Sequence, residues 1–170
     1  WSITPDRDEP TILVRIDQPG PRHSLQGLAL TSDEHWLVVA DYSTGLHAIA
    51  LRGEPTAHLL PAPATLATAL GIDGIALADR RLVVVQNGVS PVRMLELTLD
   101  LDPRGQREPI LTGSRVIFSG QPDAADPTLV TKTPDAFIAI GNAGWKHFGP
   151  RAEPDELNRT LTLLRLPFDS

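Results

Sequence analysis

The sequence has no cysteine, only two lysines and no long apolar run, and each deficit excludes a class of protein. Without cysteine there are no disulfides and no thiolate metal sites. The net charge is −6 and the arginines are scattered, so the basic surface that nucleic-acid binding needs is missing. No apolar run reaches the roughly 20 residues of a membrane helix, and the first ten residues do not resemble a signal peptide. We expect neither nucleic acid nor a membrane as a partner, and the choice between a cytoplasmic and an exported protein stays open.

Turn-forming residues are abundant instead. The chain contains 16 Pro and 13 Gly among 170 residues, and 41% of its residues are hydrophobic. Such a density of breakers favours many short elements over long helices. The apolar runs are four to six residues long and rich in Val, Ile, Leu and Thr, which is typical of strands. The sequence therefore predicts an all-β protein.

Two stretches of the chain, 26–51 and 73–97, repeat one pattern. Each begins with a polar residue and glycine, continues into a short apolar strand and a polar turn, and adds two more strands. Gly27 and Gly74 lie 47 residues apart. This spacing is close to the roughly 40–50 residues of one blade of a β-propeller.

A weaker third copy runs from 128 to 145 and reaches its next strand, 160–166, only after a long loop. We therefore predict a partial β-propeller of about three four-stranded blades cut from a six-bladed ring. The expected divisions are outer strands of a preceding blade at 1–22, a blade at 23–62, a blade at 63–120, and a last blade without its outer strand at 121–170. The segment 63–71 fits a short helical turn or an ordered loop equally well. Three blades leave open faces, so the expected partner is the missing half of the ring or a second copy.

The repeated pattern resembles a known family. QGLALTSDEHWLVVADYSTGLHAIAL is similar to the blade of gluconolactonase and senescence-marker-protein (regucalcin) relatives that begins with Asn-Gly. GIDGIALADRRLVVVQNGVSPVRMLEL is similar to the following blade, which carries a Pro-Asp-Gly motif. The resemblance implies a six-bladed propeller that uses a divalent ion, often calcium, to hydrolyse lactones or related esters.

The resemblance also implies where the site would be built. Asp73 matches the Asp of the Pro-Asp-Gly motif, so it is the expected metal ligand and catalytic general base; a turn-capping role is the alternative. Gln26 stands where the family has a metal-binding Asn, and its extra methylene requires a different geometry. The competing interpretation of Gln26 is an exposed or turn-bonded amide. Gln26 in place of Asn favours the alternative function, a non-catalytic propeller that binds a ligand or a protein.

Four further residues are candidates for substrate binding, because they follow the second strand of a unit, near one mouth of a propeller channel. They are Gln86, Asn87, Asn142 and Trp145. Turn formation is the competing interpretation for the first two, and packing between blades for Trp145. The five histidines are dispersed and lack the HExxH spacing, so the sequence does not indicate a histidine metal site.

Overall fold

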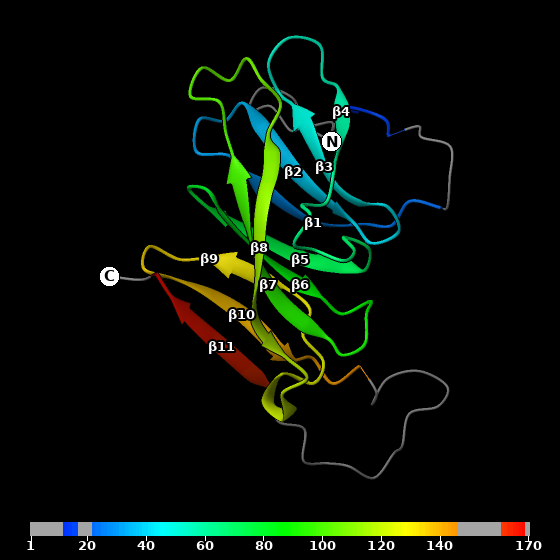
Figure 1. Ribbon diagram of the computed structural model, residues 1–170, viewed down its shortest axis with the longest axis vertical. Helices are drawn as coiled ribbons and strands as arrows, with labels where there is room; N and C mark the ends of the chain where they lie inside the picture. The colour runs from blue at the N-terminus through cyan, green and yellow to red at the C-terminus, as the bar shows by residue number, and fades with distance from the viewer. Residues whose placement is uncertain (1–11, 17–21, 146–160, 169–170) are drawn as a thin grey trace.

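Three antiparallel sheets follow one another along the chain in this computed structural model, which describes residues 12–16, 22–145 and 161–168 (Figure 1). Within each sheet, strands that follow one another in the chain are hydrogen-bonded neighbours. The first sheet contains β1 (Leu25–Leu30), β2 (Trp36–Asp41), β3 (Gly45–Ala50) and β4 (Ala57–Leu60). The second contains β5 (Ile72–Ala78), β6 (Arg81–Gln86), β7 (Arg93–Asp100) and β8 (Ile110–Ser119). The third contains β9 (Val130–Lys132), β10 (Ala136–Asn142) and β11 (Thr162–Pro167).

The second sheet is covered on both faces, which explains the unbroken apolar run of β6. Leu82 and Val84 pack toward the first sheet in one hydrophobic cluster. Val83 and Val85 point the other way, into a second cluster with Phe137 of the third sheet. All four of these β6 side chains are buried. Each fully buried side chain of this size stabilises the fold by about 1.5–3 kcal/mol, so these two layers form the core.

The first strands of the three sheets lie side by side, β1 against β5 and β5 against β9. The two stretches that repeat in sequence also share a structural irregularity. The pairing of β1 with β2 shifts between Leu25 and Leu28, and the pairing of β5 with β6 shifts between Ile72 and Ile75. Each shift is a β-bulge at the polar residue and glycine that open the unit. The two stretches that align in sequence therefore also share a bulge at the same position in the structure.

The two aligned glycines allow the first strands to approach one another. A Cβ atom on Gly27 would lie 2.7 Å from the backbone nitrogen of Ile75. A Cβ atom on Gly74 would lie 2.4 Å from the backbone oxygen of Thr128. Both distances are too short for any side chain, so these positions accept only glycine without a shift of the neighbouring strand.

The prediction of an all-β protein is confirmed, because the described residues contain no α-helix; their helical residues are all in 3₁₀ turns, among them η1 (Pro122–Ala124). The segment 63–71 is an ordered loop with turns. In the segment 1–22, where outer strands were expected, the described residues 12–16 and 22 form no strand, and residues 1–11 and 17–21 lie outside the described part. Among the described residues the third sheet has three strands. No described helix is long and apolar enough to cross a membrane.

Candidate functional site

Polar side chains gather at one end of the three sheets. Because β2, β6 and β10 run antiparallel to the first strands, their last residues meet the beginnings of β1, β5 and β9. Backbone hydrogen bonds connect the strand ends here. The Gly71 nitrogen donates to the Tyr42 carbonyl, and the Gly88 nitrogen donates to the Gly71 carbonyl. We call this end of the sheets the polar end, and it is defined by His23, Asp41, Asp73, Asn87, Asp126 and Asn142.

Asp73 and Asn87 form the centre of the polar end. Asp73 lies in the bulge of β5, which turns its side chain out of the regular alternation. The Asn87 Nδ2 donates hydrogen bonds to Asp73 Oδ2 at 2.8 Å and to the Pro127 carbonyl at 2.9 Å. The Asn87 side chain therefore ties the second sheet to the segment that leads into the third.

Two properties of this pair are chemically useful. Burial raises the pKa of Asp73, and the hydrogen bond from Asn87 offsets only part of that effect. The Oδ1 atom of Asn87 is buried and has no hydrogen-bond partner among the described residues. A half-buried carboxylate beside an unsatisfied amide oxygen can accept a proton or help to hold a hard cation, since such cations prefer oxygen ligands.

The two glutamine candidates lie in different environments. Gln26 is exposed, and its Nε2 donates to the Ser24 hydroxyl at 2.9 Å. Gln86 is fully buried. Its Nε2 donates to the carbonyl oxygens of Thr68 (3.0 Å) and Leu70 (2.6 Å), and its Oε1 accepts from Arg93 (2.7 Å). In this structure the Gln86 amide holds the loop between the first two sheets.

The third sheet contributes the remaining candidates at the edge of the polar end. Asn142 Oδ1 accepts a hydrogen bond from the backbone of Gly144 at 3.1 Å, which is a turn contact. The backbone nitrogen of Trp145 donates to Asp126 Oδ2 at 2.5 Å, and the Trp145 residue is 61% exposed. Both residues are thus close in space to Asp126, whose backbone bridge to Asn142 fixes this edge.

A second group, His23, Asp41 and His47, was not expected from the sequence. Asp41 ends β2, His47 lies in β3 on the same face, and His23 precedes β1. Ring nitrogens of the two histidines and a carboxylate oxygen of Asp41 all lie within 4.8 Å of one another. The histidines that looked dispersed in the sequence are therefore partly gathered by the fold, and this cluster could hold a metal ion.

Hydrogen bonds fix the charge state of this cluster. Burial would raise the pKa of Asp41, but hydrogen bonds from the Ser24 backbone and from His23 outweigh it and lower the pKa to about 2. Burial lowers the pKa of His47, although the charge of Asp41 opposes that effect. The carboxylate is therefore ionised and the His47 imidazole is neutral at pH 7, which are the forms that bind metals.

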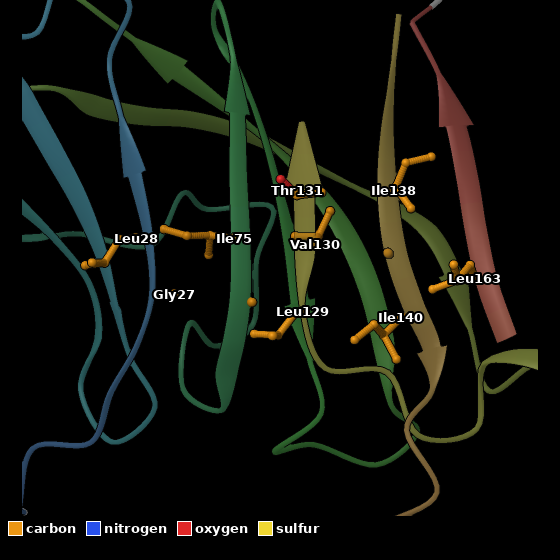
Figure 2. A pocket seen from close by; sticks show the side chains of 11 residues that line it. Gly27, Leu28, Ile75, Leu129, Val130, Thr131, Ile138, Ile140 and Leu163 are labelled. Carbon is orange, nitrogen blue, oxygen red and sulfur yellow. The ribbon is translucent and has the colours of Figure 1, made fainter. Parts of the chain in front are cut away.

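An apolar groove runs beside these groups, along the row of first strands and across the third sheet (Figure 2). Its lining is almost entirely hydrophobic. Leu28 and Ile75 lie at one side, Leu129 and Val130 in the middle, and Ile138, Ile140 and Leu163 at the other. None of the acidic or histidine residues of the polar end lines the groove.

No family model, curated protein or solved structure matches this chain. The family resemblance of the two sequence repeats therefore stays a prediction.

Proposed function

We propose that the chain is part of a β-propeller whose polar end hydrolyses lactones or related esters. The repeated order of strands supports the propeller, as do the matching bulges and the side-by-side first strands. In a propeller, such strands line a central channel and place their starts at one mouth of it. The polar end would then be that mouth.

The observation that carries the proposal is the Asp73–Asn87 pair. A carboxylate whose pKa is raised by burial is suited to accept a proton near neutral pH. The unpartnered Asn87 Oδ1 and the Asp73 carboxylate are oxygen donors of the kind that calcium takes, with water completing a shell of about 6–8 ligands. Such an ion would polarise the carbonyl of the substrate.

The reaction needs only water as a co-reactant. Asp73 takes a proton from a water molecule, and the water oxygen forms a bond to the carbonyl carbon of the lactone. The ring C–O bond then breaks, and the leaving oxygen receives the proton from Asp73. The product is the open hydroxy acid, and Asp73 is restored as a carboxylate.

A non-catalytic binding scaffold is the second candidate, and the environment of Gln26 favours it. This residue would supply a ligand in the lactonase proposal, yet its amide is exposed and bonded to Ser24. Gln86 likewise has its amide atoms engaged by the loop and by Arg93. A scaffold would bind a lactone or ester without turning it over.

The two candidates are separated by assaying a panel of lactones over a calcium titration. We expect calcium-dependent hydrolysis by the wild type and at least about a 100-fold loss in Asp73→Asn. Asp79→Asn is the matched control, because Asp79 is exposed in a turn with φ of 52°, a conformation that Asn tolerates. Equal rates in wild type and Asp73→Asn would remove Asp73 from the mechanism. Binding without turnover would support the scaffold.

A further inference from the structure

The His23, Asp41 and His47 cluster belongs to one sheet and is separate from the Asp73–Asn87 pair. The register explains how it forms. Gly45 stands directly opposite Asp41, and His47 stands opposite Val39, so His47 is diagonal to Asp41 on one face of the sheet. Since Gly45 has no side chain, nothing on β3 separates the imidazole from the carboxylate.

Hydrogen bonds orient all three members of the cluster. Asp41 Oδ1 accepts from the backbone nitrogens of Ser24 (3.0 Å) and Ser43 (2.9 Å). Thr44 Oγ1 bonds His47 Nε2 at 2.8 Å. His23 Nδ1 contacts Asp41 Oδ2. Outer partners of this kind orient imidazole and carboxylate ligands in metal sites.

Two ring nitrogens have no partner among the described residues. His47 Nδ1 is buried within a side chain that is fully inaccessible, and His23 Nε2 is buried as well. A buried polar atom without a hydrogen bond costs about 1–3 kcal/mol, and native proteins contain few of them. These two nitrogens belong to side chains that lie beside the Asp41 carboxylate, so both are available to a cation.

We propose that His23, Asp41 and His47 bind a divalent transition metal of the zinc class. Two imidazoles and one carboxylate form a donor set that suits zinc, whereas calcium prefers oxygen ligands alone. With zinc–nitrogen bonds of about 2.1 Å, tetrahedral geometry places two ligand atoms about 3.4 Å apart. The ligand atoms here lie within 4.8 Å of one another, so binding would draw the three side chains closer together. Three protein ligands leave a fourth position for water, and the side chain of His23, 24% exposed, provides the way in.

The test is calorimetric titration of tag-free, chelator-treated protein with zinc chloride. We expect one equivalent to bind, and we expect His23→Gln and His47→Gln to weaken binding at least tenfold. His58→Gln is the control, because His58 pairs with Glu108 at 2.9 Å outside the cluster. Circular dichroism of each variant checks that it is folded. His23→Gln is the decisive variant, because His23 is the least buried of the three.

Several outcomes would overturn the proposal. They are the absence of zinc binding in the wild type, wild-type affinity in folded His23→Gln, and a loss of calcium binding in His23→Gln that equals or exceeds its loss of zinc binding. The Asp73→Asn variant separates this site from the proposed hydrolase, since it should bind zinc as the wild type does. A protein that binds zinc here without hydrolysing lactones would refute only the proposed hydrolase.

Discussion

At the scale of single residues, the two repeat glycines are the most restrictive positions in the fold. A Cβ atom at Gly27 or Gly74 would collide with backbone atoms of the next strand, which cannot rotate away. We expect Gly27→Ala and Gly74→Ala each to lower the free energy of unfolding by about 1–3 kcal/mol, through overpacking. Urea denaturation followed by circular dichroism measures the change.

Gly113 provides the control for these substitutions. It lies in β8, has no positive φ, and a Cβ atom there would meet only the Thr98 side chain, at 3.6 Å. Gly113→Ala should leave the stability unchanged or raise it by up to about 1 kcal/mol, because alanine restricts the unfolded chain. Equal losses at all three glycines would show that the close approach of the first strands is not the cause.

Gln86 gives a second prediction at this scale. Replacing it by Leu removes the bonds to Thr68, Leu70 and Arg93 and leaves two carbonyl groups unsatisfied. We expect Gln86→Leu to cost about 1–3 kcal/mol and to speed proteolysis of the loop 61–71. Gln26→Leu, at an exposed position, should have little effect on either measurement. If the two variants are equally stable, the Gln86 amide does not stabilise the loop as proposed.

At the scale of the elements, cross-strand charges hold the middle of the second sheet together. Glu96 of β7 accepts from Arg81 of β6 at 2.9 Å and from Arg115 of β8 at 2.8 Å. Burial would raise the pKa of Glu96, but the two arginines outweigh it and lower the pKa below its ordinary value of 4.5. The stabilisation is therefore present above about pH 4.5 and is lost as the pH falls through the lowered pKa.

We expect Glu96→Gln to lower the stability at pH 7 by about 1 kcal/mol, the upper range for partly exposed ion pairs. The difference between wild type and variant should shrink as the pH falls below 4.5, because the unfolded chain then takes up a proton that the folded protein binds only below its lowered pKa. Denaturation at a series of pH values tests this. A difference that stays constant from pH 7 to pH 3 would contradict the assignment.

The strands were predictable from sequence, whereas the way in which polar side chains meet was only partly so. Short β-branched runs and turn residues indicated nearly every strand. The Gly27–Gly74 repeat aligned the two positions at which the structure has bulges, although the sequence itself predicted no bulge. The histidine cluster was missed because His23 and His47 are 24 residues apart. Their meeting depends on the register of β2 with β3 and on the approach of the chain before β1. Likewise, no local pattern indicates that Gln86 binds the carbonyl groups of a loop 16 and 18 residues away.

At the scale of the whole molecule, the apolar groove in Figure 2 leaves a concave hydrophobic surface uncovered by the described residues. Leu28 is 62% exposed at its β1 side and Leu163 is 61% exposed at its β11 side. Leu129 is 55% exposed and occupies, in the third unit, the place held by Gly27 and Gly74 in the others. Contiguous apolar surface of this kind marks an interaction site in soluble proteins.

We expect a second copy of the chain to cover this groove, because two sets of three sheets would supply the six blades that the family resemblance implies. Light scattering during gel filtration should then give a dimer mass at micromolar concentrations. Leu163→Lys places a charge in the groove and should raise the dissociation constant at least about tenfold, the loss expected when an apolar contact is replaced by a buried charge. Leu59→Lys, on β4 and 45% exposed outside the groove, should not. A monomer at every concentration would contradict self-association, and equal effects of both substitutions would place the interface elsewhere.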